Sequence, residues 1–148
     1  MNKLVCSLLA IVLVVCCCCC KSSKKCAKTE KYPLVGTHWS LVAVEGMEIS
    51  HDFAMRPYVT FDSTGGVYGN LGCNSFFGTY EINKKSKIKI SYQGSTKRLC
   101  QQMGVEKQFM SAWRQEINRY QIKDNELILF ADEEEIMRFS GTDLSKVE

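Results

Sequence analysis

The sequence predicts a mainly β domain: a small antiparallel β-barrel of seven to eight strands that carries one amphipathic helix. Short stretches in which apolar and polar residues alternate follow one another from Gly36 onward, separated by turn residues. A single stretch, from about Gly104 to Asn118, instead repeats its apolar residues at helical spacing. With 148 residues in all, the chain has room for one such domain and its leader.

The N-terminal segment has the pattern of a secretion signal. Lys3 gives it a positive start, and Leu4 to Val15 form an apolar run of about twelve residues, too short for the ~20 that span a bilayer as a helix. The run ends in Leu13-Val14-Val15 followed by five cysteines, which resembles the bacterial lipobox. That resemblance implies cleavage before a cysteine and acylation of its thiol.

The acylated cysteine is one of three candidates, Cys16, Cys17 and Cys18. We favour Cys17 or Cys18, because the large Val15 would stand directly before a cut at Cys16. Two alternatives stay open: an ordinary cleaved signal with unmodified cysteines, and a transmembrane anchor that extends through them. The basic stretch that follows has no large apolar side chains and predicts a flexible tether.

The chain is therefore expected to divide into four parts. We expect a lipoprotein signal peptide over 1–17, an acylated tether over 18–33, the folded domain over 34–141 and a disordered tail over 142–148.

Charge excludes nucleic acid as an expected partner. Residues 1–31 hold six of the 19 Lys and Arg and one of the 16 acids, which leaves 13 basic and 15 acidic residues from Tyr32 onward. The domain is thus weakly acidic, whereas a nucleic-acid footprint needs clustered positive charge.

Two of the nine cysteines, Cys73 and Cys100, lie in the expected domain. An even pair in an exported chain favours a disulfide. The alternative is two buried free thiols, since cysteine is among the most buried residue types.

The expected strands each alternate apolar and polar positions. In the clearest case Ile88, Ile90 and Tyr92 face inward between lysine and serine, and in another Phe76, Gly78, Tyr80 and Ile82 share one face. The expected strands are Trp39–Val44, Tyr58–Phe61, Val67–Gly69, Phe76–Ile82, Lys87–Tyr92, Tyr120–Ile122, Glu126–Phe130 and Ile136–Phe139.

One stretch predicts a helix that covers an end or face of the barrel. Its apolar residues recur three and four positions apart. They are Val105, Phe109, Ala112, Trp113 and Ile117.

No pattern in the sequence predicts catalysis, a cofactor or a metal site. His38 and His51 lack a second ligand at metal-binding spacing, and their spacing to the two cysteines matches no compact zinc motif. There is no Gly-x-Ser-x-Gly, and the four acids from Asp132 to Glu135 are expected to form a solvated turn.

One segment resembles a known family. Residues 72–80, Gly-Cys-Asn-Ser-Phe-Phe-Gly-Thr-Tyr, resemble the Gly-Cys-Asn-x-Phe/Tyr-x-Gly-x-Tyr signature of META domains, the family of the heat-shock protein HslJ, also called DUF306. Weaker matches in the same order extend the resemblance over residues 34 to 140. The chain departs from the family at Arg98-Leu99, where Met-Ala is usual.

The resemblance implies a lipocalin-like barrel with one helix, often found in envelope lipoproteins and linked to heat shock, novobiocin resistance and, in trypanosomatids, virulence. It implies no catalytic activity. The family often has cysteine at both Cys73 and Cys100, which supports the disulfide. The motif residues carry over as fold determinants: Trp39, Gly72, Asn74, Phe76, Gly78 and Tyr80.

The expected function is that of a non-enzymatic lipoprotein of the cell envelope, acting in stress or drug tolerance. We expect it on the outer membrane facing the periplasm, as a monomer bound to the lipid bilayer by its acyl anchor. Two alternatives remain: a carrier or sensor of a small apolar ligand inside the barrel, and an inhibitor-like or interaction module that uses rim loops such as Met47 to Met55.

Overall fold

The computed structural model describes residues 32–50, 55–83, 86–101 and 103–142. The expected signal peptide, the three candidate acylation cysteines, most of the expected tether and residues 143–148 of the expected tail lie outside the described residues.

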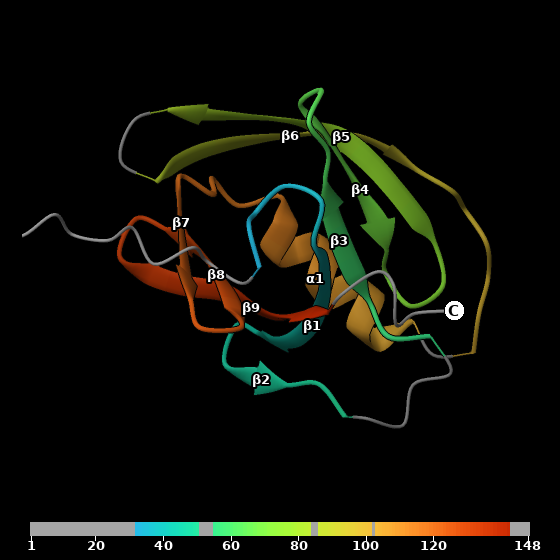
Figure 1. Ribbon diagram of the computed structural model, residues 1–148. Helices are drawn as coiled ribbons and strands as arrows, with labels where there is room; N and C mark the ends of the chain where they lie inside the picture. The colour runs from blue at the N-terminus through green and yellow to red at the C-terminus, as the bar shows by residue number, and fades with distance from the viewer. Residues whose placement is uncertain (1–31, 51–54, 84–85, 102, 143–148) are drawn as a thin grey trace, which may run out of the picture.

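The described chain forms nine strands and one helix, as Figure 1 shows. The elements are β1 (His38–Val44), β2 (Met47–Glu48), β3 (Tyr58–Phe61), β4 (Gly66–Asn70), β5 (Ser75–Asn83), β6 (Lys87–Ser95), α1 (Gly104–Trp113), β7 (Arg119–Lys123), β8 (Glu126–Ala131) and β9 (Glu134–Thr142).

All strands belong to one antiparallel sheet that curls into a nearly closed ring. Its order is β2-β1-β3-β4-β5-β6-β7-β8-β9, and β1 also pairs with β9. The strand pairing in the ring is shortest between β6 and β7, where one residue pair, Lys87 with Arg119, joins the two strands. The predicted mainly β, antiparallel fold with one helix is confirmed. The two-residue β2 is the strand that the expected count of seven to eight left out.

Period-2 alternation places the core on the inner face of the strands. In β5, Phe76, Gly78 and Tyr80 are buried, whereas Phe77 points outward with 54% of its surface exposed. Ile82 was expected to face inward but is 43% exposed. It lies in the last three residues of β5, all of which are exposed, whereas its cross-strand partner Ile88 in β6 is buried.

The helix is shorter than its sequence pattern predicts. It ends at Trp113 rather than near Asn118. After Trp113 the chain turns tightly, and the carbonyl oxygen of Asn118 already accepts a hydrogen bond from the N–H of Ile88 in β6, 3.1 Å away. Ile117 is nevertheless buried, because the turn leads it into the ring before β7 begins.

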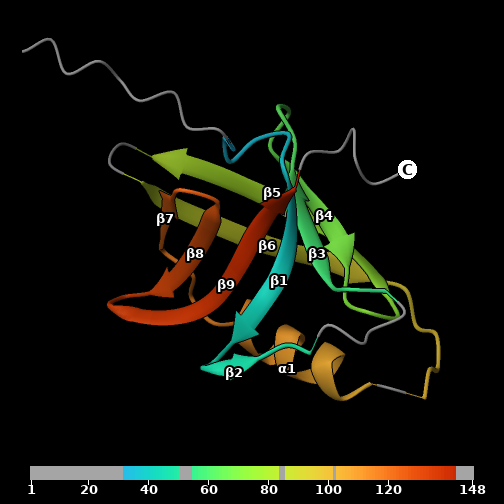
Figure 2. The ribbon, with the colours of Figure 1, turned by 60° about the horizontal axis from the view of Figure 1, so that its bottom comes forward.

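Aromatic side chains fill the ring beneath the helix, which covers one end of it (Figure 2). Phe109 and Trp113 from α1 stack with ring centroids 5.4 Å apart. Phe76 of β5 lies 5.6 Å from Phe109 and 5.2 Å from Trp113, and Phe139 of β9 completes the cluster. Such pairs contribute roughly 0.5–1.5 kcal/mol each beyond the area they bury.

Candidate functional site

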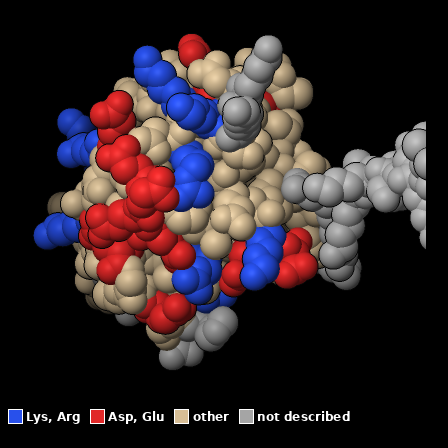
Figure 3. Space-filling view, turned by 90° about the vertical axis from the view of Figure 1, so that its left-hand side faces the viewer, with Lys and Arg blue, Asp and Glu red and all other residues tan. Residues whose placement is uncertain are grey.

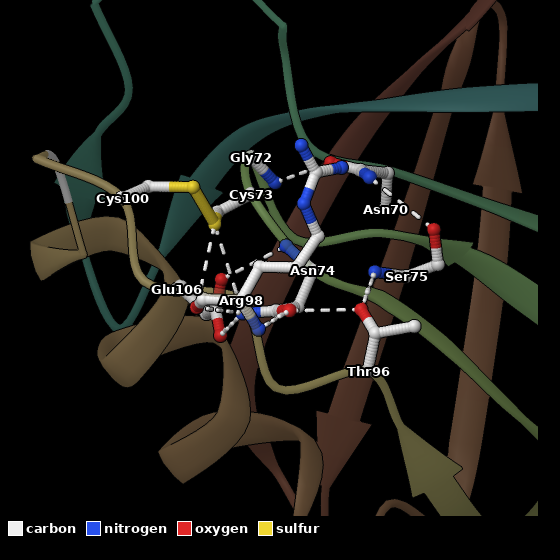
Figure 4. Close-up of a disulfide and its surroundings, with 9 residues drawn as sticks. All are labelled: Asn70, Gly72, Cys73, Asn74, Ser75, Thr96, Arg98, Cys100 and Glu106. Carbon is white, nitrogen blue, oxygen red and sulfur yellow. Dashed lines mark hydrogen bonds between the residues drawn. A yellow bond between two sulfur atoms is a disulfide. The ribbon is translucent and has the colours of Figure 1, made fainter.

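Two of the expected motif residues, Gly72 and Asn74, and both cysteines of the domain meet at the end of the ring that α1 covers, as Figure 4 shows. The turn after β4, the loop after β6 and the first turn of α1 come together there. We call this group the disulfide cluster; its members are Cys73, Asn74, Thr96, Arg98, Cys100 and Glu106.

Cys73 and Cys100 form a disulfide with their Cα atoms 6.2 Å apart and 27 positions apart in sequence. The Cys73 side is buried, whereas Cys100 is exposed on the loop after β6. Of the two alternatives that the sequence left open, the structure contains the disulfide and not a pair of free thiols. The bond ties the loop to the end of β4.

Asn74 is the centre of the cluster and is 1% exposed. Its side-chain Nδ2 donates to Glu106 Oε1 at 2.8 Å and to the carbonyl oxygen of Arg98 at 3.1 Å. Its Oδ1 accepts from the N–H of Arg98 at 2.6 Å and from the hydroxyl of Thr96 at 2.8 Å. The amide therefore uses its donors and its acceptor within the fold.

Glu106 is a buried carboxylate on the first turn of α1. Its Oε2 accepts a hydrogen bond from the main-chain N–H of Asn74 at 3.1 Å. An acid at this place also suits the positive end of the helix dipole, and α1 has no side-chain N-cap. Both carboxylate oxygens thus join the helix to the turn that carries Asn74.

The two motif glycines occupy places that disfavour a side chain, one because of its backbone conformation and the other because of a close neighbour. Gly72 has a φ of +101°, which L-residues rarely adopt. A Cβ at Gly78 would run into the main-chain oxygen of Ser91 on the neighbouring β6. A side chain would therefore obstruct the strand path at Gly78, whereas at Gly72 a Cβ would meet no atom closer than 3.6 Å and the restriction is the positive φ.

The remaining motif residues belong to the core. Trp39 is fully buried and donates from Nε1 to the carbonyl oxygen of Leu34 at 3.0 Å. Phe76 lies in the aromatic cluster, and the Tyr80 hydroxyl donates to the carbonyl oxygen of Asp62 at 2.6 Å. Burial raises the pKa of that hydroxyl.

Residues 32–143 match the META domain, which covers the whole described part of the chain. This chain belongs to the META domain family. A comparison with curated protein sequences gives no match.

Two solved structures share the fold. A protein from Burkholderia xenovorans is similar with a TM-score of 0.58 and 24% identity, over 74% of this chain and 83% of that one. A protein of the DUF4847 family from Bacteroides vulgatus is similar with a TM-score of 0.57 and 15% identity, over 72% of this chain and 93% of that one.

His38 of this META domain does not join the cluster. His38 of β1 packs against Tyr58 of β3, with the two rings tilted and their centroids 4.2 Å apart. Burial lowers the pKa of the His38 imidazole. His51 lies outside the described residues.

The acids from Asp132 to Glu135 form the turn between β8 and β9 and the start of β9. Figure 3 shows acidic side chains gathered on this face of the molecule. Glu135 pairs with Arg138 at 2.7 Å, and Glu133 lies 3.8 Å from Arg119. Within the part of the chain that the structure describes, no three His, Cys, Asp or Glu side chains are grouped to hold a metal ion.

Helices that could cross a membrane are also lacking among the described residues, since none combines the necessary length and apolar character.

Sequence patterns missed Glu106, Thr96 and Arg98 as partners of Asn74. One signal was available: Glu106 occupies the same helix face as Phe109 and Trp113, three and seven positions away. A carboxylate on an apolar face is buried only if it is hydrogen-bonded, so it needed a partner from another segment.

The cluster holds the loop after β6 rigidly against the domain and leaves the tip of that loop exposed. Leu99, directly before Cys100, has 94% of its surface exposed. The cluster therefore presents an apolar side chain to solvent on a firmly attached segment.

Proposed function

We propose that this META protein is a non-enzymatic lipoprotein of the cell envelope, held on a membrane by an acylated cysteine and acting by binding in stress or drug tolerance. The observation that carries the proposal is the Cys73–Cys100 disulfide. Disulfides persist in oxidising compartments and are rare in the cytosol. A lipobox-like run of cysteines ahead of a disulfide-bonded domain fits export to the envelope.

The hydrogen bonds of the disulfide cluster support binding rather than catalysis. A catalytic acid, base or nucleophile needs a free donor, acceptor or lone pair directed at a substrate. Asn74 and Glu106 direct theirs at each other and at the main chain, and the two cysteines have no thiol. The cluster is accordingly a structural device that fixes a loop.

The place where the described chain begins supports a binding surface that faces away from the membrane. Tyr32 lies at the end of the expected tether, and nearby Val35 bridges to Phe61 at one end of β3. The disulfide cluster follows Asn70, which pairs with Tyr58 at the other end of β3. Figures 1 and 2 place the first described residues, coloured blue, apart from the loop after β6. An anchored chain would thus present the disulfide cluster away from its point of attachment.

The alternative function, a carrier of a small apolar ligand, has less support, because side chains fill the interior of the ring where the ligand would bind. Phe109 and Phe139, which meet inside the ring, are both fully buried, and Trp113 is 3% exposed. Interiors packed by interlocking side chains leave few voids larger than a water molecule. A small apolar ligand would have to displace this aromatic cluster.

The test is the intact mass of the full chain purified from membranes of its host, before and after reduction and alkylation. We expect a diacyl or triacyl mass that starts at Cys16, Cys17 or Cys18, and alkylation of Cys73 and Cys100 only after reduction. Replacing Cys16 to Cys20 with serine should abolish palmitate labelling, whereas the Cys26→Ser control should keep it. An unprocessed, unacylated mass would overturn the anchor and the envelope location.

A further inference from the structure

We propose that the loop Thr96–Gln101 is a substrate-like inhibitory loop for a serine endopeptidase with an apolar specificity pocket, and that Leu99 enters that pocket. The inference rests on the proposed binding function and names the class of its partner. Four observations carry it: the exposure of Leu99, the direction of the main chain beside it, and the attachment of the loop on each side of the Leu99–Cys100 bond.

The exposure of Leu99 needs an explanation. It is 94% exposed, the largest value among the exposed large apolar side chains of the described chain, on a loop that has no helix or strand of its own. An exposed leucine on a fixed loop complements a concave apolar pocket. Endopeptidases select their substrates by inserting one side chain into such a pocket.

The main chain beside Leu99 is arranged as a bound substrate requires. Both the N–H and the carbonyl oxygen of Arg98 point at the Asn74 side chain, 2.6 and 3.1 Å away. An N–H and a carbonyl oxygen of one residue that point to the same side are the arrangement of a strand, in which the groups of the residues before and after point to the opposite side. Those of Lys97 and Leu99 therefore face outward, and no hydrogen bond joins them to another described residue. They are free to pair with the edge of a partner's cleft, as in strand addition.

The two sides of the Leu99–Cys100 bond are attached to neighbouring residues of the domain. On the N-terminal side, Asn74 holds Arg98 by two hydrogen bonds. On the C-terminal side, the disulfide holds Cys100 to Cys73. Cys73 and Asn74 are consecutive and buried, so both attachments share one rigid base.

This attachment turns a substrate into an inhibitor. Attack of the protease serine on the Leu99 carbonyl would form an acyl-enzyme and release the α-amino group of Cys100. The disulfide keeps that amine beside the acyl group, where it attacks the ester, re-forms the peptide bond and expels the serine hydroxyl. Hydrolysis by water would leave a Leu99 carboxylate and a Cys100 amine held in place. Preorganisation of this kind also lowers the entropy cost of binding.

The loop can be tested with the full chain extracted in detergent, titrated against chymotrypsin and subtilisin, whose pockets accept large apolar side chains, and against trypsin. We expect inhibition of chymotrypsin or subtilisin, and Leu99→Ala should weaken it by about thirty-fold or more, as loss of a central contact does. Leu99→Lys should move the inhibition to trypsin. Met47→Ala, at an exposed apolar residue of β2, is the control and should change nothing.

Lack of inhibition of both chymotrypsin and subtilisin would overturn the inference. Rapid cleavage of the Leu99–Cys100 bond with loss of inhibition would also overturn it. The same holds if the Leu99→Lys variant still inhibits chymotrypsin or subtilisin and does not inhibit trypsin. Since Leu99 is exposed, its variants should fold; an unchanged urea transition would verify this. If the chain is acylated but does not inhibit, the inhibitory role of the loop is refuted and the membrane anchor is not. If the chain inhibits but carries no acyl group, the membrane anchor is refuted and the inhibitory role of the loop is not.

Discussion

Asn74 donates a 2.8 Å hydrogen bond to Glu106, a residue 32 positions further along the chain and on the first turn of the one described helix. The contact joins the end of β4 to α1 through two buried polar side chains. Buried polar groups of this kind are strongly favoured only when every partner is present. If one of these hydrogen bonds is removed, we therefore expect α1, the turn after β4 and the loop after β6 to lose their packing together.

Replacing Asn74 with alanine should lower the free energy of unfolding by about 3 kcal/mol, because it leaves buried partners such as Glu106 without their hydrogen bonds. Urea unfolding followed by tryptophan fluorescence would measure the loss. Ser75→Ala, at the exposed neighbour, should cost far less. Equal effects of the two substitutions would show that Asn74 is not the centre of the cluster.

Removing the disulfide should destabilise the domain and release the loop. For a closed loop of 27 positions, the chain-entropy relation gives a cost of about 3–4 kcal/mol. The double variant Cys73→Ala with Cys100→Ala and the reduced wild-type chain should unfold at similar, lower urea concentrations. A reduced chain as stable as the oxidised one would contradict the prediction. Reduction of the double variant should have no effect and is the control.

Local sequence pattern predicted most of the strands, because the side-chain period of a strand is visible in the sequence itself. It did not predict β2, whose Met47 and Glu48 are both exposed and so show no alternation. The pattern also did not predict which two strands pair to close the ring. His38 and Thr142 are 104 positions apart, yet the Thr142 hydroxyl donates to the His38 carbonyl oxygen at 3.1 Å where β1 meets β9. Alternation shows which face is buried and not which strand lies alongside.

The site was predicted in part for the same reason. The motif named Gly72, Asn74 and Gly78, whose importance follows from the main chain near them. Thr96 and Arg98 bind Asn74 across more than twenty positions, and Arg98 does so with main-chain atoms that every residue has. No residue type marks such a contact in the sequence.

Gly78→Ala should be strongly destabilising, whereas Gly104→Ala should not. At Gly78 the added methyl meets the main-chain oxygen of Ser91, so β5 and β6 must separate locally, at a cost of about 2–3 kcal/mol. At Gly104, the first residue of α1, nothing lies within 4 Å, and alanine should be neutral or raise stability by up to about 1 kcal/mol. Thermal unfolding of both variants provides the comparison; equal losses would rule out the steric explanation.

Stability should decrease as the pH falls below about 6.5, and His38 should account for part of the decrease. Burial of the imidazole against Tyr58 lowers its pKa from the ordinary value of 6.5, so the unfolded chain takes up the proton first. Above that pH both states are neutral at this residue and it has no effect; below it, protonation favours the unfolded state until the folded-state pKa is reached. Urea unfolding between pH 7.5 and about pH 5, where carboxylates remain largely ionised, isolates this step. His38→Gln should flatten the pH dependence; a slope unchanged from that of the wild-type chain would assign the effect to other groups.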